Sequence, residues 1–180
     1  MSAHSHPVRS HAGRQHHLTV VAPVRPGNVT AVPMPRTPLL ACALPRVDWS
    51  DAYALALPRR ERAHPPEEWA DAIFRAPPPA VRILFGAREV LVRLVGIEPG
   101  TRHAFDLVSW SPNEVLLGID QRHLGFRASV LVQPDRVVVS TIVEVRSRRG
   151  RAYSALVRKV HPLVVRLTLA HAGRKLALAP

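Results

Sequence analysis

The sequence predicts an α+β domain in which a curved antiparallel sheet wraps around a long C-terminal helix, with two short helices after the first strand. Two observations predict this fold. From His103 to Arg146, apolar residues recur at every second position, which is the period of a β-strand. After Gly150 they recur every three or four residues, which is the period of an amphipathic helix.

Length and composition are those of one folded domain. The chain has 180 residues, of which 47% are hydrophobic, so it can bury a core. No apolar run approaches the roughly 18 to 20 residues that span a bilayer, so we expect a soluble protein with no membrane partner. Cys42 is the only cysteine, which excludes an intramolecular disulfide and a cysteine-based zinc site and fits a cytoplasmic location.

The charge balance is strongly basic, with a formal net charge of +12. A basic chain often binds nucleic acid or an anionic surface. However, Lys159 and Lys175 are the only lysines among 25 basic residues, and so much arginine is equally typical of a GC-rich genome. Nucleic acid is therefore the disfavoured partner, although nine basic residues and no acid follow Glu144.

The first 45 residues differ from the rest of the chain. They contain seven prolines, five histidines and no acid, and proline at this density opposes both helix and sheet. We expect residues 1–45 to be a disordered tail and residues 46–180 to be a single domain. The tail histidines lack carboxylate or thiolate neighbours, so no metal site and no cofactor are predicted.

The folded part is expected to begin with an edge strand at Ala52–Leu57. A short helix should follow from Pro65-Pro66, because proline at a first helical position is favourable, and it should place Trp69 and Ile73 in the core. A second helix is expected at Ala80–Val95. Four strands then form an antiparallel meander, at His103–Ser109, Val115–Ile119, His123–Val132 and Arg136–Arg146.

The last element is expected to be a helix at Ala152–Ala172, kinked at Pro162. A strand at Arg151–Leu156 before a shorter helix is the alternative. One apolar stripe of the helix should face the sheet, and its members are Leu156, Val160, Leu163, Leu167 and His171. A curved sheet is not filled by one helix, so we expect a cavity between them that suits a small apolar ligand.

Several motifs together resemble a known family. They are Gly-x-Asp-x-x-His-Leu-x-Phe-Arg from Gly118, Ser140-Thr141-x-Val143, Gly150-Arg-x-Tyr153, and His161 beside a proline in a helix. This pattern resembles the bacterial domain-of-unknown-function family 2867 over roughly residues 44–169. The resemblance implies the START-like, helix-grip (SRPBCC) superfamily, and some relatives carry this domain behind an NAD(P)-binding Rossmann domain.

Five residues are candidates for ligand binding: His123, Arg127, Thr141, Tyr153 and His161. Arg127 could hold a carboxylate or enolate oxygen while His123 transfers a proton. The alternative, which we favour, places both on a solvated strand face with Arg127 paired to Glu144. No catalytic residue is assigned.

Thr141 lies on a valine-lined strand face and could offer one hydroxyl to a ligand, or it could merely fill a strand position. Tyr153 could point its hydroxyl into the cavity, or it could pack its ring. His161 is more simply a structural hydrogen-bonding residue than a catalyst.

The leading hypothesis is a protein that binds a small apolar molecule between sheet and helix, with cyclase- or isomerase-like acid–base chemistry as an extension. Whether it is an enzyme is left open. The alternatives are a basic-surface binder of nucleic acid and a non-enzymatic interaction module beside an oxidoreductase.

Overall fold

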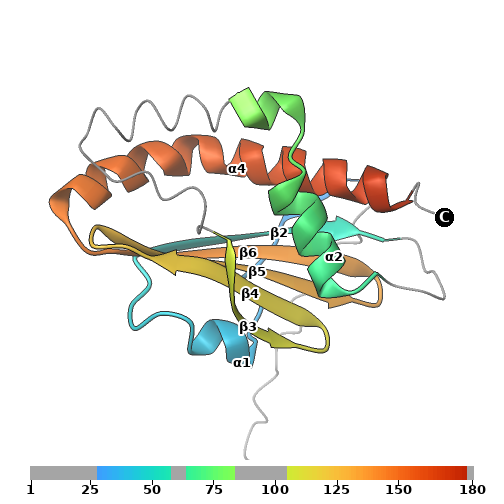
Figure 1. Ribbon diagram of the computed structural model, residues 1–180, viewed down its shortest axis with the longest axis horizontal. Helices are drawn as coiled ribbons and strands as arrows, with labels where there is room; N and C mark the ends of the chain where they lie inside the picture. Colours follow the sequence, from blue (N-terminus) through green and yellow to red (C-terminus); the bar gives the residue numbers. More distant parts are fainter. Residues whose placement is uncertain (1–27, 58–63, 84–104, 178–180) are drawn as a thin grey trace, which may run out of the picture.

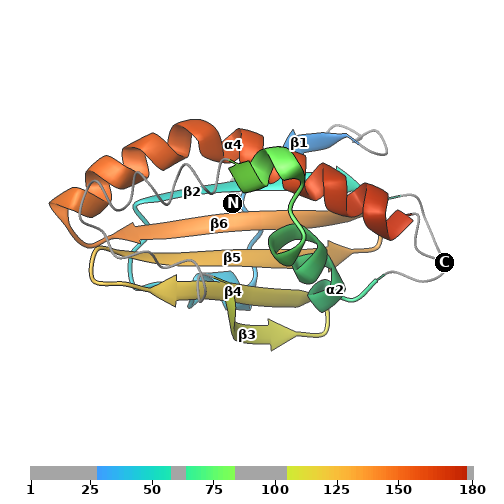
Figure 2. The same ribbon diagram turned by 45° about the horizontal axis from the view of Figure 1, so that its top comes forward.

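The computed structural model describes residues 28–57, 64–83 and 105–177. Its centre is a six-stranded antiparallel sheet with the order β1-β2-β6-β5-β4-β3, and the strands lie side by side in Figure 2. The strands are β1 (Val29–Ala31), β2 (Trp49–Ala56), β3 (Asp106–Ser111), β4 (Glu114–Asp120), β5 (Leu124–Gln133) and β6 (Arg136–Val145).

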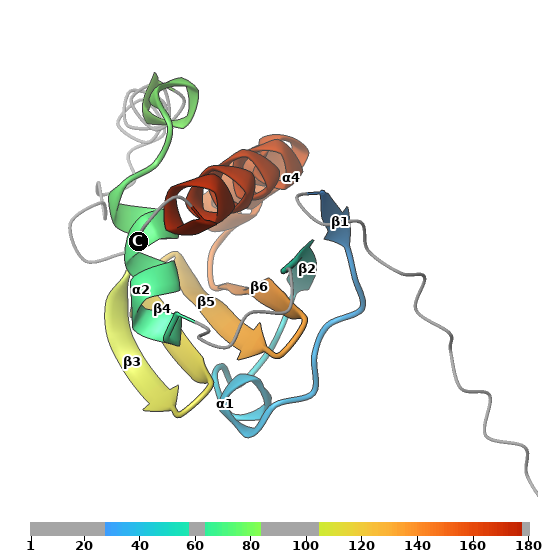
Figure 3. The same ribbon diagram turned by 90° about the vertical axis from the view of Figure 1, so that its right-hand side faces the viewer.

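Helices cover both faces of this sheet (Figure 1). The long helix α4 (Arg148–Ala177) packs over β1, β2 and β6, while α2 (Pro66–Ala70) and its continuation η1 (Asp71–Arg75) pack beside it, with α2 over β4 and β5. The short helix α1 (Pro38–Ala41) lies on the opposite face, as the end-on view in Figure 3 shows. The predicted α+β class, with a curved antiparallel sheet and a long C-terminal helix, is confirmed.

Both elements β1 and α1 lie in the segment for which we expected disorder, so that prediction is wrong for these residues. Strand β1 pairs with β2 from Val29 to Ala31, and this pairing makes β2 an inner strand rather than the expected edge. Leu40 of α1 is buried against the sheet beside Leu116 and Ile142. Proline density concealed these elements because β1 is a proline-free stretch of three residues, and α1 carries its one proline, Pro38, in the first turn, where proline is favourable.

The meander agrees with its predicted strands to within two residues at every predicted end that the structure describes. The predicted beginning of the first strand, His103, lies outside the described residues. The predicted helix after Pro65 is also present, and Trp69 and Ile73 are buried in the main core. Of the second predicted helix, residues 80–83 are helical, and the remainder lies outside the described residues.

Antiparallel pairing aligns residues of different strands into rows across the face that α4 covers. One row contains Asp51, Thr141, Ala128 and Leu117. The two flanking rows are apolar except for the indole of Trp49 and the hydroxyl of Tyr53, and they are Trp49-Val143-Phe126-Ile119 and Tyr53-Val139-Val130-Val115. A carboxylate and a hydroxyl therefore lie side by side in an otherwise apolar surface.

Helix α4 begins four residues earlier than expected and is helical throughout residues 151–156, so the strand alternative is wrong. Its buried face also differs from the predicted one. The side chains buried on it are Tyr153, Ser154, Val165, Thr168, Leu169 and Ala172. The predicted stripe is exposed at its four apolar members, Leu156, Val160, Leu163 and Leu167.

The physical reason is that the buried face was selected by close fit as well as by apolarity. At Gly173 an added Cβ would lie 2.4 Å from Cδ2 of Leu55, so the helix approaches the sheet closely there. Small and hydroxyl-bearing residues such as Ser154 and Thr168 also permit this approach. The hydroxyl of Thr168 donates to the carbonyl oxygen of Val164 in its own helix, 3.0 Å away, which removes the cost of burying it.

Substitution of two neighbouring leucines tests this orientation. Leu169 is fully buried and Leu167 is 39% exposed. We expect Leu169→Ala to lower the free energy of unfolding by about 2 to 5 kcal/mol, because it leaves a cavity. Leu167→Ala should cost less than about 1 kcal/mol. Urea unfolding of both variants makes the comparison, and equal losses would contradict the orientation.

Candidate functional site

Three polar side chains meet where α4 crosses the middle of β2 and β6, and we call them the Asp51–His161–Thr141 cluster. Nδ1 of His161 lies 3.0 Å from Oδ2 of Asp51, and Nε2 lies 3.4 Å from the hydroxyl of Thr141. Both partners come from one row of the sheet, because Asp51 and Thr141 are paired in the register of β2 and β6. The imidazole thus bridges two neighbouring strands.

The hydrogen-bond partners assign a donor or acceptor role to each ring nitrogen. An ionised carboxylate can only accept, so Nδ1 carries a proton and donates it to Asp51. In the neutral imidazole Nε2 is then an acceptor, and the hydroxyl of Thr141 is its donor. The side chains of His161 and Asp51 are 14% and 23% exposed, so the cluster is largely buried but remains in contact with solvent.

One atom of the cluster is left without a partner. Oδ1 of Asp51 is buried and accepts no hydrogen bond from any residue that the structure describes. An unsatisfied buried acceptor typically costs about 1 to 3 kcal/mol. The atom is therefore an acceptor whose hydrogen-bonding capacity is not used within the described residues.

Trp49 forms one wall beside the cluster. Its indole meets the His161 ring edge-to-face, with centroids 5.4 Å apart, and its Nε1 donates to the hydroxyl of Ser154 at 2.5 Å. The guanidinium of Arg158 lies 5.8 Å from the centroid of the same indole. Trp49 therefore contacts three residues of α4 and holds that helix over the polar row.

The arrangement suits proton transfer. A carboxylate-oriented imidazole is the usual general acid or base, with Nε2 as the reacting atom. Thr141 completes an order of carboxylate, imidazole and hydroxyl, but its side chain is only 3% exposed. A hydroxyl so buried suits hydrogen bonding to His161 better than attack on a substrate.

Sequence reasoning identified Thr141 and His161 but missed Asp51, Trp49 and Ser154. The expected strand began at Ala52, so Asp51 was left outside it. The signal that could have found it is alternation: Trp49, Asp51 and Tyr53 occupy every second position, which places a carboxylate on an aromatic strand face.

Arg127 lies on the other face of the sheet and takes no part in the cluster. Its guanidinium bonds to Asp120 Oδ2 at 2.5 Å and to the carbonyl oxygens of Ile119 and Phe126. The expected pairing with Glu144 is wrong, because Glu144 pairs with Arg146 instead. The cause is Gly118, where an added Cβ would lie 2.6 Å from Cδ of Arg127, so the side chain lies across this glycine toward Asp120.

His123 and Tyr153 lie near the beginning of α4. Tyr153 is buried with Leu124 in a small cluster that Phe126 and Val157 complete. The backbone of His123 approaches α4 so closely that a Cβ at Gly150 would lie 2.2 Å from its carbonyl oxygen. Among the five predicted site residues, the structure brings Thr141 and His161 together through the 3.4 Å contact, and it places Arg127 on the other face of the sheet.

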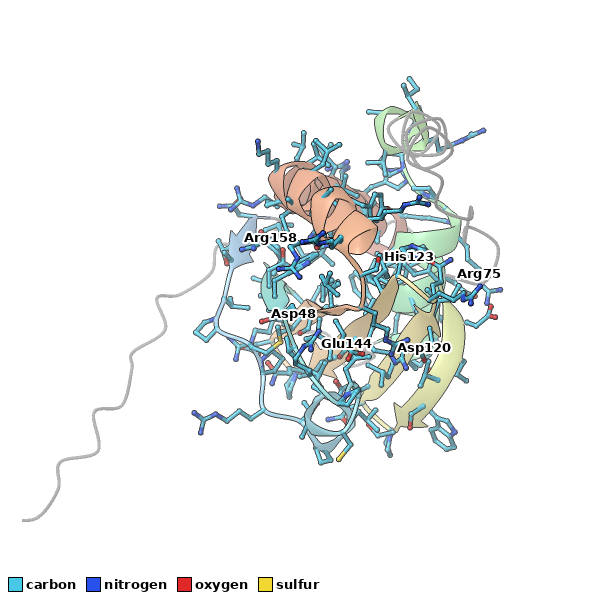
Figure 4. All side chains as sticks on the ribbon, turned by 90° about the vertical axis from the view of Figure 1, so that its left-hand side faces the viewer. Asp48, Arg75, Asp120, His123, Glu144 and Arg158 are labelled. Atoms are coloured by element: carbon cyan, nitrogen blue, oxygen red, sulfur yellow. The ribbon has the colours of Figure 1, made fainter. Side chains whose placement is uncertain are left out.

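Asp120 belongs to an ion network away from α4, as its position beside Glu144 in Figure 4 shows. Burial opposes ionisation of this carboxyl, but hydrogen bonds from Arg127 and Arg146 outweigh it and lower its pKa. Arg146 reaches Asp120 Oδ1 at 2.8 Å and Glu144 Oε2 at the same distance. The network is thus a cross-strand clamp at the end of β4, β5 and β6.

In the part of the chain that the structure describes, no group of three His, Cys, Asp or Glu side chains could hold a metal ion. Nor is any helix in that part both long and apolar enough to cross a membrane.

The clamp predicts a pH dependence of stability. A carboxyl with a lowered pKa stabilises the fold above its unfolded pKa of about 3.9, and that contribution is lost as the pH falls through the folded value. Asp120 is half-exposed, so we expect Asp120→Asn to cost only about 1 to 2 kcal/mol at pH 7. The cost should shrink below about pH 4.

Urea unfolding of wild type and Asp120→Asn, at pH 7 and again below about pH 4, measures how the cost of the substitution changes with pH. Asp71→Asn is the matched control, because its ion pair with Arg75 is well exposed and should contribute less than about 0.5 kcal/mol. A loss for Asp120→Asn that stays constant down to pH 3 would contradict the clamp.

Comparison with known proteins gives a family and no further relative. The sequence matches the family described as "Protein of unknown function (DUF2867)" over residues 43–168. No curated protein and no solved structure matches the chain. The match begins before β2 and ends within α4, so it includes every residue of the Asp51–His161–Thr141 cluster. The chain belongs to the DUF2867 family.

Proposed function

We propose that the protein binds a small, largely apolar molecule between the sheet and the N-terminal half of α4, in contact with the Asp51–His161–Thr141 cluster. The observation that carries the proposal is the buried, unpartnered Oδ1 of Asp51 beside an oriented imidazole. A vacant acceptor and a proton-transfer group in one place are more than packing requires.

The surroundings support an apolar ligand. The rows on either side of the polar one present Val143, Phe126, Val139 and Val130 to the helix side of the sheet. A few convergent polar groups in a mainly apolar surface are the usual composition of a small-molecule site. The polar groups would orient the ligand, and the apolar side chains would supply most of the affinity.

The architecture supports the same proposal. A curved antiparallel sheet with a long C-terminal helix across it is the layout expected for the START-like, helix-grip superfamily that the sequence resembles. In that layout a ligand lies between helix and sheet, which is where the cluster is found. START-like membership is part of this proposal.

The cluster also supports acid–base chemistry of the cyclase or isomerase kind. The 3.4 Å contact between Nε2 and Thr141 is at the long limit of a hydrogen bond, so a ligand oxygen can replace it at small cost. Nε2 would then take a proton from the ligand or return one, while Asp51 stabilises the imidazolium that forms.

Two valines of α4 provide the test. Val157 packs beside Tyr153 and Leu124 on the sheet side, whereas Val160 is on the exposed side. We expect wild-type protein to bind the neutral apolar dye N-phenylnaphthylamine. Val157→Trp should abolish the fluorescence change because the indole fills the ligand's place, and Val160→Trp should retain it.

Thermal unfolding of both tryptophan variants is the control that checks whether they are folded. Wild-type protein that leaves the dye fluorescence unchanged would overturn the proposal. Equal binding by the two tryptophan variants would contradict the location between sheet and helix.

The alternative from the sequence, a binder of nucleic acid or another anionic surface, has one structural observation in its favour. Helix α4 exposes eight basic side chains and contains no acid, and they are Arg148, Arg149, Arg151, Arg158, Lys159, Arg166, Arg174 and Lys175. It stays a prediction, as does the interaction module beside an oxidoreductase.

A further inference from the structure

We propose that the ligand of this site carries an anionic group, such as a carboxylate or sulfonate, and that Arg158 binds it. This inference rests on the proposed function and names the chemical class of the ligand: an organic anion with an apolar body. It assigns a specificity role to one of the eight exposed basic residues of α4.

Arg158 is the basic side chain next to the cluster. It precedes His161 by three residues, so the two side chains are neighbours on one side of the helix. Trp49 contacts both, with its ring edge-to-face to His161 and 5.8 Å from the guanidinium carbon of Arg158. The guanidinium of Arg158 and the imidazole of His161 are therefore separated by the Trp49 indole alone. Arg158 lies on the α4 side of the sheet (Figure 4).

The charge of Arg158 is not neutralised by a carboxylate within the described residues. Its side chain is exposed, and within residues 28–57, 64–83 and 105–177 it forms no ion pair. Helix α4 itself contains no acid, and the nearby carboxylate of Asp51 directs Oδ2 to His161. A guanidinium over an aromatic face keeps its N–H edge free, and that edge fits a carboxylate with two parallel hydrogen bonds.

The signs of the charges also define the ligand's direction. Asp51 would repel an anion placed at the polar row, so the charged end must lie outward at Arg158. The apolar body then points inward along the valine rows, and its donor group reaches the vacant Oδ1 of Asp51. An apolar cation would reverse both contacts and would meet Arg158 with like charge.

The chain contains a matched control in Arg166. This residue is also exposed, and its guanidinium lies 5.4 Å from the ring centroid of Tyr53, two strand positions beyond Asp51. It follows Arg158 by eight residues, which is about 12 Å along a helix. Both arginines therefore have the same charge and the same kind of aromatic neighbour, but only Arg158 shares its ring with His161.

Two dyes with the same apolar body test the inference. Anilinonaphthalene sulfonate differs from N-phenylnaphthylamine by one sulfonate, and both fluoresce when they leave water. We expect wild-type protein to bind the sulfonate at least about tenfold more tightly, the size of one charge-assisted hydrogen bond. Arg158→Met should remove this preference and leave the neutral dye within about twofold of wild type, while Arg166→Met should alter neither affinity.

Two further variants test the geometry of the arginine contact and the location of the bound dyes. Arg158→Lys should restore part of the preference, because it returns the charge without the bidentate edge. Val157→Trp should abolish binding of both dyes, which shows that they occupy the site and not the exposed Leu and Val stripe of α4.

The outcomes separate the two proposals. Neutral dye bound without a preference for the sulfonate would overturn the anionic ligand and leave the proposed function standing. Equal loss of sulfonate affinity in Arg158→Met and Arg166→Met would also overturn it, because general attraction to a basic helix would explain the preference. Failure of wild-type protein to bind the neutral dye would overturn the proposed function itself.

Discussion

The hydrogen bond between Asp51 and His161 connects two residues that are 110 positions apart in the chain, and it does so at the middle of the fold. It requires that β2 pairs with β6, because this pairing places Asp51 beside Thr141 under the helix. It also requires that α4 presents His161, and not the leucine stripe, to the sheet. Strand order, helix rotation and the polar cluster are therefore three aspects of one arrangement.

The two faces of the sheet differ in how their carboxylates are hydrogen-bonded. On the face under α1 the carboxylates are paired: Glu114 accepts hydrogen bonds from Thr37 and Ser129, and Asp120 is paired with Arg127 and Arg146. Nε of Arg127 and the hydroxyl of Ser140 on this face have no partner among the described residues. The face under α4 leaves one carboxylate oxygen unsatisfied within the described residues. Groups that are fully paired stabilise a fold, whereas a vacant acceptor beside an imidazole is what a ligand can use.

The sequence was informative where local pattern determines structure. Alternation located the meander, and the motif with two prolines located the helix that buries Trp69. Periodicity also found α4 but not its buried face, because two sets of residues in this helix share the same spacing. The apolar side chains predicted that the face with Leu156, Val160 and Leu163 is buried. The opposite face is buried instead, because Gly173 permits a close approach to the sheet and the hydroxyl of Thr168 bonds within its own helix.

The site was predictable only in part, for a related reason. Thr141 and His161 each stood out within their own elements, but their contact depends on how α4 is rotated. Arg127 was expected to pair with Glu144 on β6. The direction of its side chain depends instead on the space left by Gly118 in β4, which an alternating pattern of apolar residues does not reveal. Asp51 required the exact beginning of β2, and strand ends are poorly determined by pattern.

Methyl NMR of β6 during titration with N-phenylnaphthylamine tests the central claim most directly. Residues of this strand alternate between the α4 face and the α1 face, so one strand reports on both. The account predicts that the methyl signals of Val139, Thr141 and Val143 shift, while those of Val138 and Ile142 stay in place. Shifts confined to Val138 and Ile142, or no shifts at a saturating dye concentration, would contradict a ligand site between the sheet and α4.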